Sequence, residues 1–221
     1  MYDLEEARLI EEIKKRSPRR VLLQFPEGLK PLATKLAQRL ENACGVEVFI
    51  SGDACYGACD LALLQKRQLQ ADLLIHVGHA EIPGEVAGGD IIYVEARSDE
   101  KIEKPLAEAL KLLKDEKNIG LAASVQHLHL LDAARQKLEQ AGKVVRVGNA
   151  SGRLKYAGQI LGCDYGSARA VAGNVDAFLV IAGGAFHALG VSLSSSKRTV
   201  VVDPYKKTAR DATGLVDRIL R

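Results

Sequence analysis

Two cysteines, Cys59 and Cys163, occupy equivalent places in a pattern that the chain repeats. Each is followed at once by an aspartate, and thirteen residues after each cysteine another aspartate opens an apolar stretch typical of a strand. Such self-similarity predicts one structural unit present twice. If the two units pack with approximate rotational symmetry, the two thiols converge near the axis. Because thiolates are soft ligands suited to iron–sulfur clusters, the pattern predicts that these two cysteines bind one metal cluster.

A zinc site is an alternative use of the same region. Cys55 and Cys59 are separated by three residues, and His76 and His79 follow with two residues between them, a spacing that loosely resembles a zinc finger. The histidine spacing is shorter than usual, however, and zinc here would leave the cysteine of the second repeat without a role. Cys55 has no counterpart in the second unit, and Cys44 fits a small buried residue, so we expect neither to bind the cluster.

The elements that must position these side chains alternate along the chain. Near-continuous apolar stretches predict buried strands at residues 20–24, 46–50, 72–76, 90–95, 118–122, 143–147, 176–181 and 198–202. Helical patterns are expected at residues 4–13, 29–40, 60–68, 105–113, 128–141 and 209–220. Apolar strands that alternate with helices predict an α/β fold with parallel sheets covered on both faces. We expect two tandem, similar α/β units, residues 1–97 with Cys59 and residues 98–221 with Cys163.

The polar motifs of the chain gather where the expected strands end. They lie at residues 24–28, 52–59, 76–79, 124–127, 148–152, 183–187 and 203–205. Glycine and proline end strands in any protein, so each motif alone has an ordinary structural explanation. The carboxyl ends of parallel strands meet at one edge of a sheet, however, and that edge is where such sheets bind ligands. Seven polar motifs there, with four of the five histidines, therefore predict an active site.

The composition excludes several classes of protein. The 221 residues are 47% apolar and 27% charged, and a net charge of +3 gives no reason to expect binding to nucleic acid or to a membrane. No apolar run approaches the roughly 20 residues of a membrane helix. The N-terminus is acidic and amphipathic, unlike a signal peptide, and four cysteines without such a signal favour reduced thiols or metal ligands. We therefore expect a cytoplasmic protein.

These motifs, in this order, resemble the diphthamide synthase family, the archaeal radical 3-amino-3-carboxypropyl transferase of the first step of diphthamide biosynthesis. The resemblance extends over the chain from about residue 20. The residues that carry it are Gln24-Phe25-Pro26-Glu27-Gly28-Leu29, Gly52-Asp53, Tyr56-Gly57-Ala58-Cys59, His76-Val77-Gly78-His79, Val125-Gln126, Ile160-Leu161-Gly162-Cys163, Phe186-His187 and Asp203-Pro204-Tyr205.

The resemblance implies a 4Fe–4S cluster in a homodimer. In that family three similar domains each give one cysteine to the cluster, and Cys59 and Cys163 match the first two ligands. The chain is expected to lack the family's third unit, because it stops one helix beyond Asp203-Pro204-Tyr205. We therefore expect the 221 residues alone to hold an incomplete or labile cluster, since two thiolates do not replace three.

The resemblance also implies a reaction. The 3-amino-3-carboxypropyl group of S-adenosylmethionine is transferred to a histidine of translation elongation factor 2 by a radical mechanism that needs an electron donor. The residues implied to bind this co-substrate are Gln24, Glu27, Gly28, Asp53, Tyr56, His76, Gly78, His79 and Gln126. Two other hypotheses stay open: a non-catalytic partner or regulatory module that retains the fold, and a zinc-structured nucleotide-binding protein.

Overall fold

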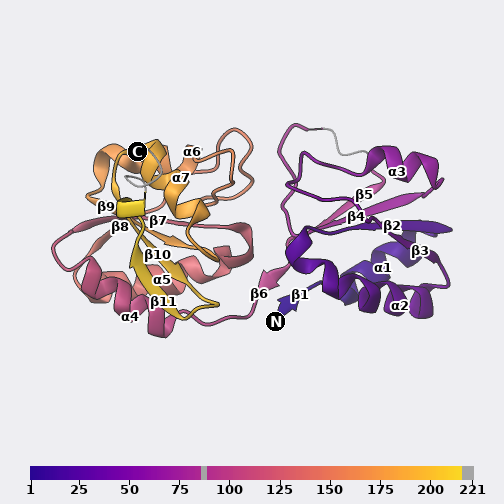
Figure 1. The fold of residues 1–221 in the computed structure, drawn as a ribbon, viewed down its shortest axis with the longest axis horizontal. Coiled ribbons are helices and arrows are strands. Elements are labelled where there is room, and N and C mark those ends of the chain that lie inside the picture. The colour runs from indigo at the N-terminus through magenta and orange to yellow at the C-terminus, as the bar shows by residue number, and fades with distance from the viewer. Residues whose placement is uncertain (86–88, 216–221) are drawn as a thin grey trace. The chain divides into compact units, whose positions relative to one another are not determined.

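The computed structural model describes residues 1–85 and 89–215, and Figure 1 shows the order of its helices and strands. The backbone divides into two compact units, Tyr2–Arg97 and Ser98–Arg221 with Met1. Each unit has a sheet and an apolar core of its own. None of the helices within the described residues is long and apolar enough to cross a bilayer.

The first unit is built on a four-stranded parallel sheet in the order β3-β2-β4-β5. Its elements are β1 (Tyr2–Asp3), α1 (Glu6–Arg16), β2 (Arg20–Gln24), the 3₁₀ helix η1 (Glu27–Leu32), α2 (Ala33–Cys44), β3 (Glu47–Ile50), α3 (Leu63–Gln68), β4 (Leu73–Val77) and β5 (Ile91–Val94). Alternate residues of β4 belong to two apolar clusters: Leu73 and Ile75 pack with α1 and α2, whereas Leu74 packs in a second cluster. Burial on both faces explains why the central strands β2 and β4 are mostly apolar.

The second unit has a five-stranded sheet in the order β11-β10-β9-β7-β8. Its elements, with the short strand that precedes them, are β6 (Arg97–Ser98), α4 (Glu103–Leu112), β7 (Asn118–Ala123), η2 (Val125–Leu130), α5 (Leu131–Gln140), β8 (Val144–Arg146), α6 (Gly166–Val171), η3 (Ala172–Asn174), β9 (Ala177–Ile181), α7 (Phe186–Ser195), β10 (Arg198–Asp203) and β11 (Thr208–Asp211). Leu179 and Phe178, neighbours on β9, face separate apolar clusters, so this sheet is also covered on both faces.

The two units share one topology. The order β8-β7-β9-β10 in the second sheet repeats the order β3-β2-β4-β5 in the first, with every one of these pairings parallel. In both units the first strand of the repeat leads into a 3₁₀ helix that continues as an α-helix. The expected fold class, two similar α/β units with parallel sheets, is confirmed.

The repeated aspartates have the same structural role in both units. The carboxylate of Asp72 accepts hydrogen bonds from the backbone N–H groups of Arg19 and Arg20, at the start of β2. The carboxylate of Asp176 accepts the equivalent bonds from Lys117 and Asn118, at the start of β7. These backbone bonds lower the pKa of both carboxyl groups. In both units the repeated aspartate therefore joins the starts of two neighbouring strands.

The structure corrects two expectations about helices. The helix expected at residues 209–220 is wrong at its start, because Thr208–Asp211 is an antiparallel edge strand paired with β10. A helix begins only at Thr213, and residues 216–221 lie outside the described residues. The helices expected from Leu29 and Leu128 begin as 3₁₀ helices instead. Pro31 lies within the first of these and has no backbone N–H to donate.

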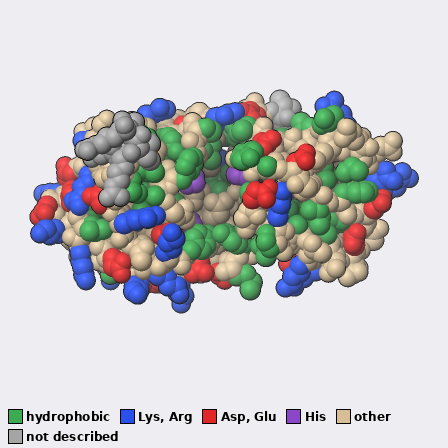
Figure 2. Space-filling model, in the orientation of Figure 1, with side chains coloured by type: hydrophobic (Ala, Val, Ile, Leu, Met, Phe, Trp, Pro, Cys, Tyr) green, Lys and Arg blue, Asp and Glu red, His purple; other side chains and the backbone are tan. Residues whose placement is uncertain are grey.

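Charged side chains of both signs are interspersed on the molecular face shown in Figure 2. Lys and Arg side chains lie beside Asp and Glu side chains over both units, in keeping with the small net charge of +3. The ion pairs at the surface include Arg20 with Glu47 at 2.9 Å. Exposed pairs of this kind contribute little to stability.

Candidate functional site

The predicted polar motifs of the first unit follow the carboxyl ends of its parallel strands. β2 ends at Gln24, and β4 is followed at once by Gly78 and His79. The loop after β3 carries Cys55 and Cys59. Because parallel strands end at one edge of their sheet, these side chains can act on the same ligand.

Gln24 organises this edge from within the protein. Its side chain is only 3% exposed, and its amide Nε2 donates to the backbone carbonyl of Asp60 at 2.6 Å. Its Oε1 accepts from the backbone N–H of Ala62 at 3.0 Å and lies 2.9 Å from Nδ1 of His76. Gln24 therefore ties the end of β2 both to the cysteine loop and to the end of β4.

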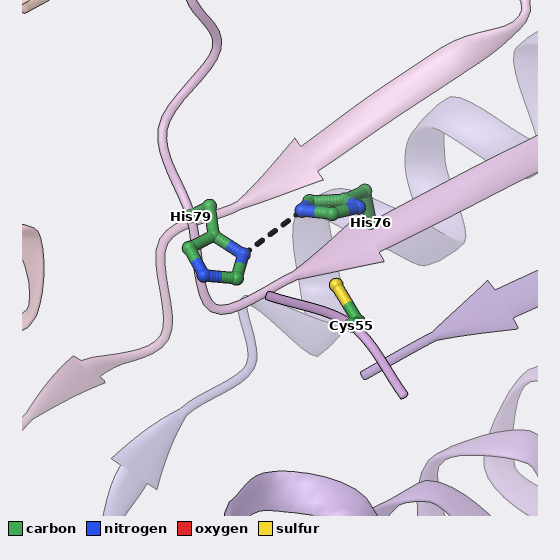
Figure 3. Close-up of side chains that lie close together, drawn as sticks. All are labelled: Cys55, His76 and His79. Atoms are coloured by element: carbon green, nitrogen blue, oxygen red, sulfur yellow. Dashed lines mark hydrogen bonds between the residues drawn. The ribbon is translucent and has the colours of Figure 1, made fainter. Parts of the chain in front are cut away.

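His76 and His79 form a hydrogen-bonded pair at the end of β4, with His76 Nε2 2.9 Å from His79 Nδ1 (Figure 3). His76 is completely buried and His79 is half-buried. Burial lowers the pKa of His76 to about 3, and the neighbouring His79 contributes to the same effect. His76 is therefore a neutral imidazole at any physiological pH.

The loop after β3 exposes one cysteine and buries another. Cys59 is exposed, whereas Cys55 is buried and lies beside His76 and His79. Burial is the main cause that raises the pKa of the Cys55 thiol. The backbone N–H of Tyr56 donates to the carboxylate of Asp60 at 3.1 Å, which folds the loop back on itself. The structure therefore brings together Cys55, His76 and His79, three of the four residues of the alternative zinc site that the sequence suggested.

The second unit presents Cys163 in the equivalent connection, between β8 and α6. Its thiol is exposed, and Nη1 of Arg153 donates to its sulfur at 3.9 Å. The carboxylate of Asp164 accepts from the backbone N–H groups of Arg153 at 3.0 Å and Gly166 at 2.8 Å, which shapes the loop around the cysteine.

The other residues implied by the resemblance differ in their exposure. Glu27, Gly28, Asp53 and Tyr56 are exposed, Gln126 is half-buried, and Gly78 is buried. Oδ2 of Asp53 accepts a hydrogen bond from Gln65 at 2.6 Å. Gly78 has φ of +93°, and a Cβ there would lie 2.8 Å from the ring of Pro26, so this position requires glycine.

His127, after β7 in the second unit, is a buried residue that the sequence analysis did not select. Its side chain is 1% exposed and its Nδ1 has no hydrogen-bond partner. Burial is the main cause that lowers its pKa to about 4. Its ring contacts Tyr205 edge-on at 5.4 Å between centroids, next to the strand-end motif that follows β10. Its place inside one of the seven polar motifs was the only signal in the sequence.

A pH dependence of stability follows from the lowered pKa of His127. The unfolded chain takes up a proton on this imidazole below about pH 6.5, whereas the folded chain does so only near pH 4. Stability is therefore complete above pH 6.5 and falls with acidification, by about 1.4 kcal/mol per pH unit from this group. Urea unfolding at pH 7, 6 and 5 should show a smaller acid loss in His127→Leu than in the unaltered chain. Identical losses in both proteins would show that His127 does not resist protonation.

Comparison with known proteins shows which family has this topology and these strand-end motifs. The sequence profile of the family described as "Putative diphthamide synthesis protein" matches residues 25–221. The chain belongs to this diphthamide synthesis family. It is 35% identical over 210 residues to 2-(3-amino-3-carboxypropyl)histidine synthase of Pyrococcus horikoshii, covering 94% of this chain and 59% of that protein. It is 30% identical over 213 residues to subunit 1 of the Homo sapiens synthase, covering 93% of this chain and 47% of that protein.

Solved structures give the same result. The crystal structure of Dph2 from Pyrococcus horikoshii superposes with a TM-score of 0.86 at 33% identity, covering all of this chain and 64% of that one. The structure of the same protein with a 4Fe-4S cluster superposes with a TM-score of 0.81 at 33% identity, covering 96% of this chain and 61% of that one. The chain thus spans about half to two thirds of the length of these relatives.

Proposed function

We propose that this protein transfers the 3-amino-3-carboxypropyl group of S-adenosylmethionine to a histidine of translation elongation factor 2. In this proposal a 4Fe–4S cluster bound by Cys59 and Cys163 drives the reaction by a radical mechanism. The observation that carries the proposal is the equivalent placing of two exposed thiols in two units of one topology. The names of the relatives, and the Dph2 structure with a 4Fe-4S cluster, support it.

The two thiols have the properties that a cluster ligand needs. Cys59 and Cys163 are exposed and free, on loops that tolerate small adjustments. Nη1 of Arg153 donates to the sulfur of Cys163 at 3.9 Å, which helps to orient that thiol. Cys44, by contrast, is half-buried and its sulfur lies against the carbonyl of Ile10 at 3.9 Å. We therefore assign the cluster to the two exposed thiols and leave Cys44 as a packing residue.

When bound, the cluster supplies the single electron that cleaves a C–S bond of the sulfonium. The protein's own residues bind and orient the co-substrate. Glu27 and Asp53 are exposed carboxylates suited to the ammonium group, and Tyr56, 87% exposed, offers an aromatic face to the adenine. Gly28 gives close access to the backbone of η1, where a Cβ would meet nothing.

The buried members of the set act through their neighbours. Gln24 and His76 hold the half-buried His79 in place through the hydrogen bonds at the end of β4, and Gly78 lets the chain turn there. Gln126, half-buried in the second unit, is proposed as a further polar contact for the amino-acid part of the co-substrate. In the proposal Gln24, His76 and Gly78 position their neighbours, whereas His79 and Gln126 contact the co-substrate.

The resemblance to the family supplies the remaining parts of the proposal. The protein acts in the cytoplasm as a homodimer, receives its electron from a separate donor, and meets the elongation factor as its protein substrate. The mixed surface charge in Figure 2 and the net charge of +3 fit partners other than nucleic acid.

Mass spectrometry of the elongation factor tests the proposed transfer. The protein, as the cell makes it, is reconstituted with iron and sulfide without oxygen, reduced, and incubated with S-adenosylmethionine and the factor. We expect one histidine of the factor to gain the mass of a 3-amino-3-carboxypropyl group. An unmodified factor after full reduction of the cluster would contradict the proposal, whereas the 221 residues alone are expected to turn over poorly because two thiolates give a labile cluster.

A further inference from the structure

Three side chains of types that bind metals well come together in the first unit. The exposed Cys59 is not among them. They are Cys55, His76 and His79, and one ligand atom from each lies within 4.8 Å of the other two (Figure 3). Among the described residues, these three form a group of histidine, cysteine and acidic side chains whose ligand atoms lie close enough together to bind one metal ion. Figure 3 shows the sulfur of Cys55 beneath the ring of His76, with the Nδ1 edge of His79 facing the same ring.

The hydrogen bonds of Gln24 determine which nitrogen of His76 carries the proton. The amide of Gln24 is oriented by two backbone groups, because its Nε2 donates to a carbonyl and its Oε1 accepts from the N–H of Ala62. The atom that faces Nδ1 of His76 is therefore an acceptor, so Nδ1 carries the hydrogen. His76 is neutral because it is buried, and its Nε2 consequently presents a lone pair toward His79.

This arrangement is the usual support of a metal-binding histidine. Such a residue donates its second ring N–H to a carbonyl or carboxylate oxygen, which fixes the tautomer and points the lone pair at the ion. Here the amide oxygen of Gln24 has that role. The donor set, one thiol and two imidazoles, suits Zn²⁺ and similar borderline-soft divalent ions.

We propose that Cys55, His76 and His79 form a binding site for a single Zn²⁺ ion, separate from the cluster ligand Cys59. Sulfur and nitrogen ligands around tetrahedral zinc lie about 3.3–3.6 Å apart. The two imidazole nitrogens, 2.9 Å apart, must separate slightly, and the sulfur must approach them by about 1 Å at most. Cys55 lies on a loop outside any helix or strand, which allows that movement. Three protein ligands leave the fourth tetrahedral position of the ion for water.

Binding of zinc must release one proton to solvent. The ion binds the thiolate of Cys55, so the thiol proton leaves. His76 already has its lone pair on Nε2, and His79 moves its N–H from Nδ1 to Nε2 without a net change in protonation. Because protons compete with the ion for the Cys55 sulfur, zinc binding should weaken as the pH falls.

This site shares His76 and His79 with the proposed co-substrate residues, but its test does not depend on the transfer reaction. It uses neither Cys59 nor Cys163, and its three ligands belong to one unit. Loss of zinc binding with retention of the iron–sulfur absorbance, or the reverse, therefore separates failure of one proposal from failure of the other.

Titration of the iron-free chain with Zn²⁺ and with Co²⁺ tests the site. We expect one equivalent of metal, and a Co²⁺ spectrum with a thiolate charge-transfer band and the strong visible bands of a tetrahedral ion. Cys55→Ser should remove the charge-transfer band, and both Cys55→Ser and His79→Ala should weaken Zn²⁺ binding by at least about 100-fold, since loss of a direct ligand exceeds the 10–100-fold effect of a supporting partner.

Two cysteine variants serve as matched controls. Cys44→Ser lies in the same unit on α2, and Cys59→Ser lies four residues from the proposed ligand. Both should retain the cobalt spectrum and the zinc affinity. The proposal is overturned if no equivalent of zinc binds, if Cys55→Ser and His79→Ala bind as the unaltered chain does, or if Cys59→Ser alone removes the thiolate band. In any of these cases His76 and His79 form only a hydrogen-bonded pair beside the buried thiol of Cys55.

Discussion

Replacement of either Cys59 or Cys163 by alanine is expected to abolish the broad visible absorbance of the anaerobically purified protein. A four-iron cluster needs thiolates within cluster dimensions, and loss of one of the few available ligands leaves iron exposed to solvent and easily lost. Both thiols are exposed and occupy equivalent connections, β3 to α3 and β8 to α6. The expected effect is therefore equally large for the two cysteines, although they lie about a hundred residues apart.

The remaining two cysteines provide the control. Cys44→Ala and Cys55→Ala should retain most of the absorbance, because one thiol packs on α1 and the other faces the histidines. Iron content and the visible spectrum, measured on all four variants in parallel, give the comparison. Full absorbance in Cys59→Ala or in Cys163→Ala would exclude that residue as a cluster ligand.

Gly148→Ala is expected to cause a large loss of stability in the second unit. A Cβ at this position would lie 1.8 Å from the backbone oxygen of Ser167 and 2.6 Å from its carbonyl carbon. Backbone atoms cannot move aside as a side chain can, so α6 or the loop after β8 must shift. Overpacking of this kind costs about 1–3 kcal/mol or more. For a chain of this size the melting temperature should fall by roughly 2–4 °C per kcal/mol.

Gly173→Ala is the matched control for that substitution. It lies in the same unit, within η3, where a Cβ would meet no atom within 4 Å and φ is not in the left-handed region. Thermal unfolding followed by circular dichroism should show little change for this variant, within about 0.5 kcal/mol. Equal melting temperatures for the two variants would show that the approach of Ser167 to the strand-end loop is not tight. The loop at residues 148–152, one of the seven polar motifs of the sequence, thus has a packing role.

The strands were the most predictable part of the molecule. Strands β2 and β4 are buried on both faces, so each contains an apolar run, Val21–Leu23 and Leu73–Ile75, that stands out from the helices. The repeat around Asp72 and Asp176 was also visible in the sequence, and both carboxylates bind the backbone at the start of a neighbouring strand. Local pattern and tertiary role agree at these positions.

β11 could not be predicted in the same way. Thr208–Asp211 is four residues long, lies at the sheet edge, and is half exposed, so it has neither a continuous apolar run nor a strong alternation. Its pairing with β10 depends on the turn at Asp203, whose carboxylate accepts the backbone N–H groups of Tyr205 and Lys206. A strand formed by such a turn depends on tertiary structure rather than on local propensity.

The sequence predicted the motifs of the candidate site but not the contacts between their side chains. The sequence placed Gln24, His76 and His79 at strand ends, and the structure joins them by hydrogen bonds. It grouped Cys55 with the histidines only in the alternative zinc site, because the absence of a counterpart in the repeat argued against a role for that thiol in the cluster. Repeats reveal what two units share, whereas Cys55 belongs to the first unit alone.

The nucleoside released from S-adenosylmethionine tests the central claim most directly. The protein, as the cell makes it, is reconstituted and reduced without oxygen, incubated with S-adenosylmethionine, and its products are separated by chromatography. Cleavage on the methionine side of the sulfonium, to give the 3-amino-3-carboxypropyl group, predicts methylthioadenosine, and Cys59→Ala should produce none. If 5′-deoxyadenosine is the main product, a different sulfonium bond is broken, and if Cys59→Ala forms methylthioadenosine as before, the cluster assignment is wrong.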